Sequence, residues 1–239
     1  MNKKLNTNAN SYTIVYAAVI VIIVAFLLAF VSSILKQRQE NNVALDKKKQ
    51  ILAALNLRDL DDTKASELYS TYIIKDNVID DSNKIVAEGS KGGEATGFKL
   101  NSADAKQGKL ALYICNVDGK TKYVIPVYGM GLWGPISGYI AINDDKNTIY
   151  GAYFNHESET AGLGAEIKDN KAWQDQFIGK KIMLPNDPSH IALQVVKKSD
   201  VKNPTVQCDA VTGATLTSNG VSEMLQECLG KYLKFLNDK

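Results

Sequence analysis

The sequence predicts an α+β protein in which one N-terminal transmembrane helix precedes a largely antiparallel sheet with flanking helices. Three observations predict this class. Residues 11–35 carry no charge, four strand-like runs with short polar turns fill residues 109–155, and apolar residues recur at helical spacing over residues 221–236. The chain has 239 residues, 45% of them hydrophobic, which is enough for one or two packed domains.

The first element is an uncharged run, SYTIVYAAVIVIIVAFLLAFVSSIL, over residues 11–35. A helix needs about 20 apolar residues to cross a bilayer, and this run is long enough. The alternative is a cleaved signal peptide, but its apolar core is usually only about 7–15 residues long. We therefore expect a transmembrane helix over residues 11–35, in contact with membrane lipid, and a cytoplasmic tail over residues 1–10.

The charges beside this helix bear on its orientation. Lys3 and Lys4 precede the span, whereas a larger group of positive residues follows it: Lys36, Arg38, Lys47, Lys48 and Lys49. Positive residues are enriched on the cytoplasmic side, so this count alone would place the C-terminal part in the cytoplasm. The count is a weak indication, because long domains are translocated largely regardless of charge.

Residues 36–108 are expected to form a linker helix and a loop-rich subdomain. The stretch LDKKKQILAALNL, residues 45–57, predicts a short helix with Ile51, Leu52 and Leu55 on one side. Residues 59–99 are charged and rich in turn formers, which indicates a loop or small subdomain.

Residues 109–239 are expected to form the main domain. Strands are predicted for KLALYICNV, KYVIPVYG, ISGYIAIND and TIYGAYFN, with a further candidate in HIALQVVKKSD. Their short polar connections favour antiparallel hairpins. KAWQDQFIGK predicts a short helix, with Trp173 and Phe177 on one face. The last helix is marked by apolar residues at i, i+3 and i+4: Val221, Met224, Leu225, Cys228, Leu229, Tyr232, Leu233 and Leu236.

Composition excludes several classes of function. The formal charge of +2 and the lack of a long basic block argue against nucleic-acid binding. The three cysteines form no C-x-x-C pair, so neither a disulfide framework nor an iron–sulfur motif is indicated. No nucleophile elbow is present and no G-x-G-x-x-G opens a βαβ unit, which argues against an independent hydrolase and against an NADH site.

The stretch DAVTGATLTSNGV, residues 209–221, is the strongest candidate for a site. Gly213 lets the backbone approach a ligand closely, and a helix N-terminus favours a phosphate. The alternative is a plain helix cap provided by Ser218 or Asn219. No capping box supports that alternative, because neither Thr217 nor Ser218 is followed three residues later by Glu or Gln. The sequence also carries more hydroxyls than a cap needs: Thr212, Thr215, Thr217 and Ser218.

Two further stretches hold candidate ligand contacts. In GMGLWGPISGYIAI, residues 129–142, Trp133 either stacks on a flat ligand or covers the edge of the core. In HESETAGLGAEI, residues 156–167, His156 and Glu159 hint at a metal, but their spacing matches no zinc motif and we expect no metal site. A Gly162-Leu163-Gly164 turn in the same stretch either approaches a planar ligand or simply connects two elements.

The pattern Asp-x-x-Thr-Gly-Ala-Thr, from Asp209 to Thr215, resembles the flavinylation motif of proteins that carry flavin mononucleotide (FMN) bound covalently through its phosphate. The resemblance implies that Thr215 receives FMN as a phosphoester. It also implies that a separate flavin transferase makes this bond and that Asp209 is needed for recognition by that enzyme.

The three stretches occur together, in this order, in the family of the C subunit of the sodium-translocating NADH:quinone reductase, and the similarity spans nearly the whole chain. One departure is Ala161, where related sequences usually have a proline before Gly-Leu-Gly. The second alternative is the G subunit of the related ferredoxin:NAD electron-transport complex, which shares the anchor and the flavinylation motif. A non-redox, membrane-tethered binding module is the alternative from a different class.

The resemblance implies a membrane-anchored flavoprotein subunit with an FMN-binding domain over residues 109–239. Such a subunit relays electrons that began on NADH towards another flavin subunit and finally quinone, coupled to sodium export, and has no NADH site of its own. Its partners are the other subunits of the complex and, during maturation, the flavin transferase. The family also places the flavin domain on the outer, periplasmic side of the bacterial cytoplasmic membrane, against the charge count.

The resemblance further implies two groups of site residues. The loop around the phosphate comprises Thr212, Gly213, Ala214, Leu216, Thr217 and Ser218, next to Thr215 itself. The candidates beside the flavin ring are Trp133 and Leu163, with Glu159 and Thr160 nearby.

Overall fold

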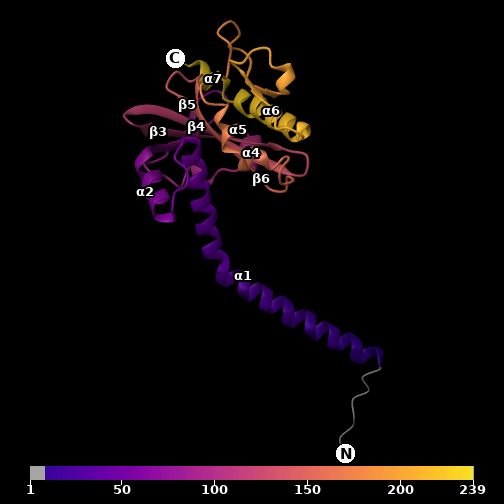
Figure 1. The fold of residues 1–239 in the computed structure, drawn as a ribbon. Coiled ribbons are helices and arrows are strands. Elements are labelled where there is room, and N and C mark those ends of the chain that lie inside the picture. The colour runs from indigo at the N-terminus through magenta and orange to yellow at the C-terminus, as the bar shows by residue number, and fades with distance from the viewer. Residues whose placement is uncertain (1–8, 239) are drawn as a thin grey trace, which may run out of the picture. The chain divides into compact units, whose positions relative to one another are not determined.

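The computed structural model describes residues 9–238, and the chain divides after Asp46 into two compact units (Figure 1). The tail predicted for residues 1–10 lies outside the described residues except for its last two positions.

The first unit consists of most of one long helix, α1 (Asn10–Ala54). Its most apolar window has a mean hydropathy of 3.2 and no buried residue, so α1 is long and apolar enough to cross a membrane. The expectation of a separate helix over residues 45–57 is wrong, because the same helix continues to Ala54. The reason is visible in KQRQENNVA, residues 36–44, which contains no glycine or proline to end a helix.

The second unit is built on a six-stranded antiparallel sheet, which confirms the predicted fold class. Its order is β2-β1-β3-β4-β5-β6. The strands are β1 (Ile73–Ile79), β2 (Ile85–Ala87), β3 (Leu110–Val117), β4 (Lys120–Met130), β5 (Pro135–Asn143) and β6 (Ile149–His156). The first two strands come from the region expected to be loop-rich, so the sheet extends N-terminal of residue 109.

The β3–β4 hairpin shows how local sequence sets the register. Asp118 and Gly119 connect the strands with φ values of 51° and 77°. A two-residue turn with positive φ at both positions matches the right-handed twist of the flanking strands. The pair Asp-Gly therefore fixes Val117 opposite Lys120, and every later pair in the hairpin follows.

One face of the sheet is covered by the end of α1 and by α2 (Asp62–Tyr72), which is capped by Asp61. Tyr113 and Val124 are paired across β3 and β4 and are fully buried on this face. The hydroxyl of Tyr113 donates to the main-chain oxygen of Gly97 in the short helix η1 (Gly97–Lys99). This layer is followed in the chain by α3 (Ser102–Lys106).

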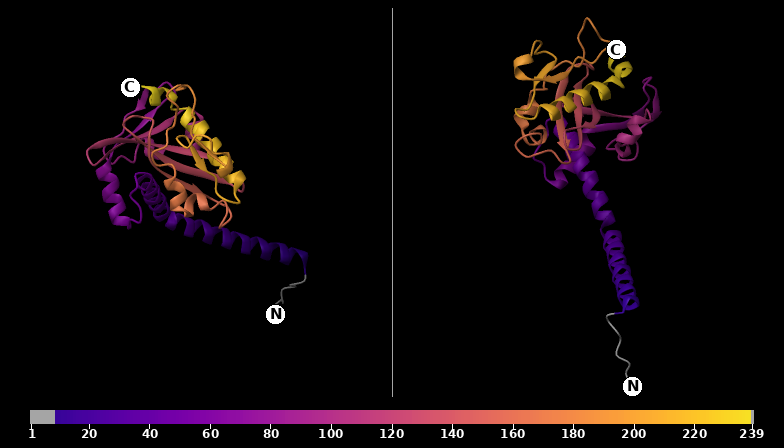
Figure 2. Two further views of the ribbon diagram at one scale, coloured as in Figure 1. Left: turned by 45° about the horizontal axis from the view of Figure 1, so that its top comes forward. Right: turned by 90° about the vertical axis from the view of Figure 1, so that its right-hand side faces the viewer.

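The other face packs against α6 (Thr215–Gly230) and α7 (Leu233–Asn237). In the left view of Figure 2 the sheet lies between α6 and α2. Smaller elements complete this layer: α4 (Glu166–Asp169), α5 (Lys171–Asp175), η2 (Lys198–Asp200) and a parallel pair of short strands, β7 (Gln194–Val196) and β8 (Gln207–Asp209). The expected C-terminal helix is present, but it begins at Thr215 and is broken after Gly230.

Candidate functional site

The N-terminus of α6 carries the strongest sequence motif. Thr215 is the first residue of the helix, and both Thr215 and Leu216 are exposed. No side chain caps the helix, and its N-cap residue is Ala214. An uncapped helix start offers main-chain N–H groups and partial positive charge to an anion.

A tight turn leads into this helix. The N–H of Ala214 donates to the oxygen of Val211 at 3.1 Å, with Gly213 inside the turn at φ 77°. A positive φ at that position favours glycine, which has no Cβ. The turn exposes Thr212 and Gly213 directly beside Thr215.

The plain-cap hypothesis for Ser218 or Asn219 is wrong, because both lie inside α6 rather than at its start. Ser218 has another role: its fully buried hydroxyl accepts a hydrogen bond of 3.0 Å from the N–H of Val211. This bond holds the Val211–Ala214 turn against the first turn of α6.

Asp209, the first residue of the motif, is fixed through its main chain. The indole N–H of Trp173 donates to its oxygen at 2.7 Å, and its own N–H donates to Oε1 of Gln176 at 2.9 Å. Burial raises the pKa of the neighbouring Cys208 thiol to about 12, so this cysteine stays protonated and acts as a small core residue. Sequence reasoning missed the roles of Trp173 and Gln176, because no motif connects them with Asp209.

Glu159 joins the three sequence motifs. Its Oε1 accepts from the N–H of Trp133 at 2.8 Å, and its Oε2 accepts from the hydroxyl of Thr217 at 2.6 Å. The side chain is only 7% exposed. Trp133 lies in the β4–β5 loop, Glu159 follows β6, and Thr217 lies in the first turn of α6, so the carboxylate connects its own segment with two others.

Large apolar side chains are exposed around this junction: Met130, Leu132, Trp133, Leu163 and Leu216. Trp133 is 65% exposed, which rules out the alternative that it covers the edge of the core. A Cβ atom on Gly213 would lie 3.0 Å from Cδ2 of Leu163, which places Leu163 against the motif turn. Thr160 is also exposed, and its main-chain oxygen accepts from the N–H groups of Leu163 and Ala165.

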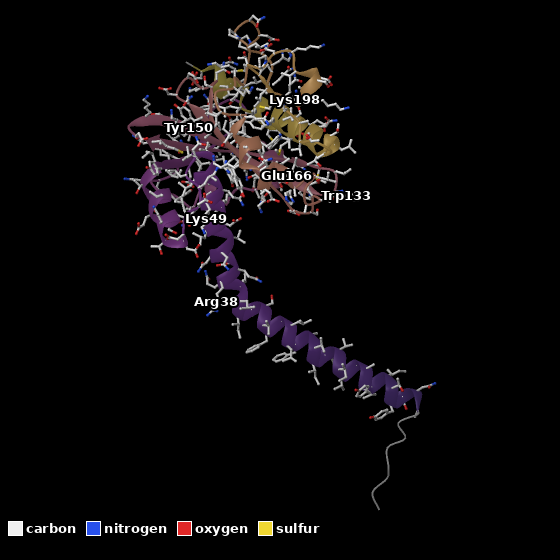
Figure 3. All side chains as sticks on the ribbon, viewed as in Figure 1. Arg38, Lys49, Trp133, Tyr150, Glu166 and Lys198 are labelled. Atoms are coloured by element: carbon white, nitrogen blue, oxygen red, sulfur yellow. The ribbon has the colours of Figure 1, made fainter. Side chains whose placement is uncertain are left out.

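A polar cleft of about 470 Å³ borders the Asp209–Thr212 segment. Its walls come from α4, α5, η2 and the Asp209–Thr212 segment, and include Glu166, Asn170, Trp173, Gln176, Lys198, Asp209 and Thr212. Figure 3 labels Trp133, Glu166 and Lys198, which lie on the part of the domain that carries α6. Within residues 9–238, no cluster of three His, Cys, Asp or Glu side chains is arranged to hold a metal.

The fold and this site are those of a flavin-binding domain. The model of the family described as "FMN-binding domain" matches residues 131–230, a range that contains Trp133, Glu159, Leu163 and the whole of the Asp209–Thr215 motif.

Curated relatives narrow the class to one family. The chain is 30% identical over 242 residues to the C subunit of Na(+)-translocating NADH-quinone reductase from Haemophilus ducreyi, covering 95% of this chain and 92% of the relative. It is 32% identical over 212 residues to the subunit of the same name from Vibrio vulnificus, covering 82% and 81%. The chain belongs to the family of the C subunit of Na(+)-translocating NADH-quinone reductase, as the sequence motifs predicted.

Solved structures agree with this assignment. The crystal structure of the corresponding reductase subunit from Parabacteroides distasonis matches with a TM-score of 0.78 and 34% identity, covering 86% of this chain and 98% of that one. Shewanella oneidensis NqrC matches with a TM-score of 0.66 and 22% identity, covering 84% and 97%, and supports the fold alone. Membership of this family, together with the long apolar α1, makes the protein membrane-anchored.

Proposed function

We propose that this chain is the flavoprotein subunit of a sodium-translocating NADH:quinone reductase and that Thr215 carries its FMN as a phosphoester. The observation that carries the proposal is the position of Thr215: an exposed hydroxyl on the first residue of an uncapped helix, directly after the Gly213 turn. A phosphate esterified there would lie at the positive end of α6.

The residues around Thr215 divide by what their side chains already contact. Thr212, Gly213, Ala214 and Leu216 surround the attachment point. The hydroxyl of Thr217 is hydrogen-bonded to Glu159, and that of Ser218 to the N–H of Val211. These two side chains therefore stabilise the Thr212–Thr215 loop from the protein interior. We assign them to positioning the phosphate loop through the helix backbone.

The exposed apolar side chains provide a place for the flavin ring. Trp133 presents a large flat aromatic side chain, and Leu163 and Leu216 add apolar surface close to the attachment point. Glu159 and Thr160 complete this side of the site. When bound, FMN supplies one- and two-electron chemistry, and the chain's own residues hold it and keep its surroundings apolar.

The other subunits of the reductase exchange electrons with this flavin, and a separate flavin transferase, for which Asp209 is the recognition residue, attaches it. The C-terminal domain lies on the outer side of the cytoplasmic membrane. Protease added to intact spheroplasts should therefore cleave this domain, and a domain left uncut would place it inside.

Mass spectrometry tests the attachment directly. The full chain, produced together with its transferase, should show a C-terminal peptide heavier by FMN minus water, with the added mass on Thr215. The Thr215→Ala variant should lack both this mass and the yellow fluorescent band of a denaturing gel. A colourless wild-type protein of unmodified mass would instead leave a tethered binding module without a redox role.

A further inference from the structure

We infer that Glu159 is a positioning residue, which fixes the loop that carries Trp133 relative to the first turn of α6, where Thr215 lies. The part of this inference that concerns the flavin rests on the proposed function, whereas the part that concerns the protein's own contacts does not.

The two carboxylate oxygens of Glu159 serve two different segments. Oε1 accepts from the N–H of Trp133 at 2.8 Å, and Oε2 accepts from the hydroxyl of Thr217 at 2.6 Å. Thr217 is 1% exposed and lies two residues beyond Thr215 in α6. A single side chain therefore spans from the exposed tryptophan to the attachment helix.

The residues just before Glu159 strengthen the same connection. The hydroxyl of the preceding residue, Ser158, donates to the oxygen of Trp133 at 3.0 Å, so both polar main-chain groups of Trp133 are bonded to residues 158–159. The N–H of Glu159 itself donates to Nδ1 of His156 at 3.2 Å. This bond fixes the main chain at Glu159, from which the carboxylate extends to its two partners.

Two glycines make room for this carboxylate. A Cβ atom on Gly131 would lie 2.4 Å from Oε1, and one on Gly164 would lie 2.3 Å from Oε2. Neither glycine is among those with positive φ, in contrast to Gly162 and Gly213. The close approach of the Glu159 carboxylate therefore explains why glycine stands at both positions.

The glutamine and alanine variants of Glu159 should differ in the hydrogen bonds that they keep. In Glu159→Gln, the amide oxygen can accept from the N–H of Trp133 while the amide N–H₂ donates to the Thr217 hydroxyl, which can rotate to accept. In Glu159→Ala, both bonds are lost, so the N–H of Trp133 and the buried hydroxyl of Thr217 lose their acceptor. A positioning role predicts that glutamine rescues the alanine defect.

The first measurement uses the full chain in detergent, produced without the transferase and therefore free of flavin. Hydrogen exchange of the Trp133 amide should be at least about tenfold faster in Glu159→Ala than in the wild type, because its acceptor is gone. Glu159→Gln and the control Glu157→Ala, which changes an exposed neighbouring carboxylate, should stay within about twofold of the wild type. Equal rates in Glu159→Ala and wild type would overturn the inference, as would a glutamine variant as fast as the alanine variant.

The second measurement uses protein matured with the transferase. All Glu159 variants should carry FMN on Thr215, because Thr215 itself is unchanged. The fluorescence lifetime of the bound flavin, which a nearby tryptophan shortens, should lengthen in Glu159→Ala and return to the wild-type value in Glu159→Gln. An unchanged lifetime in Glu159→Ala would overturn the flavin part of the inference.

The two proposals fail differently. Absence of FMN from the wild type refutes the proposed function and leaves the exchange result valid. If Glu159→Ala does not fold, Thr217→Val replaces it. That variant removes only the Oε2 partner, and it should accelerate exchange of the Trp133 amide less than Glu159→Ala would, but measurably. No acceleration in Thr217→Val would then count against the inference.

Discussion

The indole N–H of Trp173 lies 2.7 Å from the main-chain oxygen of Asp209, to which it donates a hydrogen bond. This bond connects α5 with the end of β8, where the Thr215 motif begins. The indole also packs against Phe154 and Phe177 in the core, at ring-centroid distances of 5.5 and 5.4 Å. Trp173 therefore contributes both to stability and to the placement of the motif.

Replacing Trp173 by Phe should lower the free energy of unfolding by about 2 kcal/mol, from one lost hydrogen bond and a partly emptied aromatic site. Urea unfolding of the detergent-solubilised chain measures this loss. Flavin loading by the transferase should also fall, because the main-chain oxygen of Asp209 loses its hydrogen bond from the indole. The matched control is Trp133→Phe, where the side chain is exposed and the change should stay within about 0.5 kcal/mol. Equal losses in both variants would contradict the assignment.

Two glycines two residues apart separate backbone strain from close packing. Gly164→Ala places a methyl group 2.3 Å from Oε2 of Glu159 and 2.7 Å from the Thr217 hydroxyl, and should cost about 1–3 kcal/mol. Gly162→Ala meets nothing within 4 Å, so only its φ of 71° is unfavourable, at about 1 kcal/mol. Denaturant unfolding gives both values. Moreover, only Gly164→Ala should accelerate exchange of the Trp133 amide, and acceleration in both would show that the turn acts as a whole.

The sequence predicted the central strands well because their signals are local. Runs such as LALYICNV are bounded by strong turn formers, and Asp118-Gly119 fixes a hairpin by its own conformational preference. The strand β1, IIKDNVI, was not predicted, because Asp76 and Asn77 interrupt its apolar pattern. Both side chains are buried and accept hydrogen bonds from the main chain of a segment 12–22 residues later, which only the folded chain supplies.

The site shows the same division between local and long-range information. The motif predicted Thr215 at the entrance of a helix, but the hydroxyl residues after it suggested a later start. The structure commits Ser218 to Val211 and Thr217 to Glu159, so these side chains serve the interior rather than a cap. Glu159 was predicted as a neighbour of the flavin. Its link between Trp133 and α6 depends on partners 26 and 58 residues away, for which sequence spacing gives no signal.

The three cysteines should be unreactive in the folded protein. Cys115, Cys208 and Cys228 are free and buried. Burial raises the pKa of all three thiols, that of Cys208 to about 12, so almost no thiolate is present at pH 8. Iodoacetamide at pH 8 should leave the native protein unlabelled after an hour and add three groups once it is denatured. Mass spectrometry counts the groups, and rapid native labelling of Cys208 would show that the segment before the motif opens.

Lys47, near the end of α1, has an unusual environment for a lysine. Its ammonium group donates to the main-chain oxygens of Phe98 and Leu100 and lies over the Phe98 ring. Burial lowers its pKa from 10.5 to about 8, although the charges of Asp104 and Asp76 act in the opposite direction. The folded chain therefore binds this proton more weakly than the unfolded chain does.

Between pH 8 and 10.5 the unfolded chain holds a proton on Lys47 that the folded chain has largely released, so the contribution of Lys47 to stability should rise with pH through this window. Below pH 8 both states are protonated and this dependence disappears. From pH 8 to 9.5 we expect Lys47 to contribute a gain of about 1–2 kcal/mol in the wild type that is absent from Lys47→Met. The three buried thiols, whose pKa is raised, oppose this gain equally in both proteins, so the difference between the two slopes reports Lys47. The comparison ends at pH 9.5, because burial raises the pKa of Tyr69 and Tyr113 and folding then opposes their ionisation near pH 10. Urea unfolding of both proteins in detergent gives the two slopes, and identical slopes would show that Lys47 keeps its proton in the folded state.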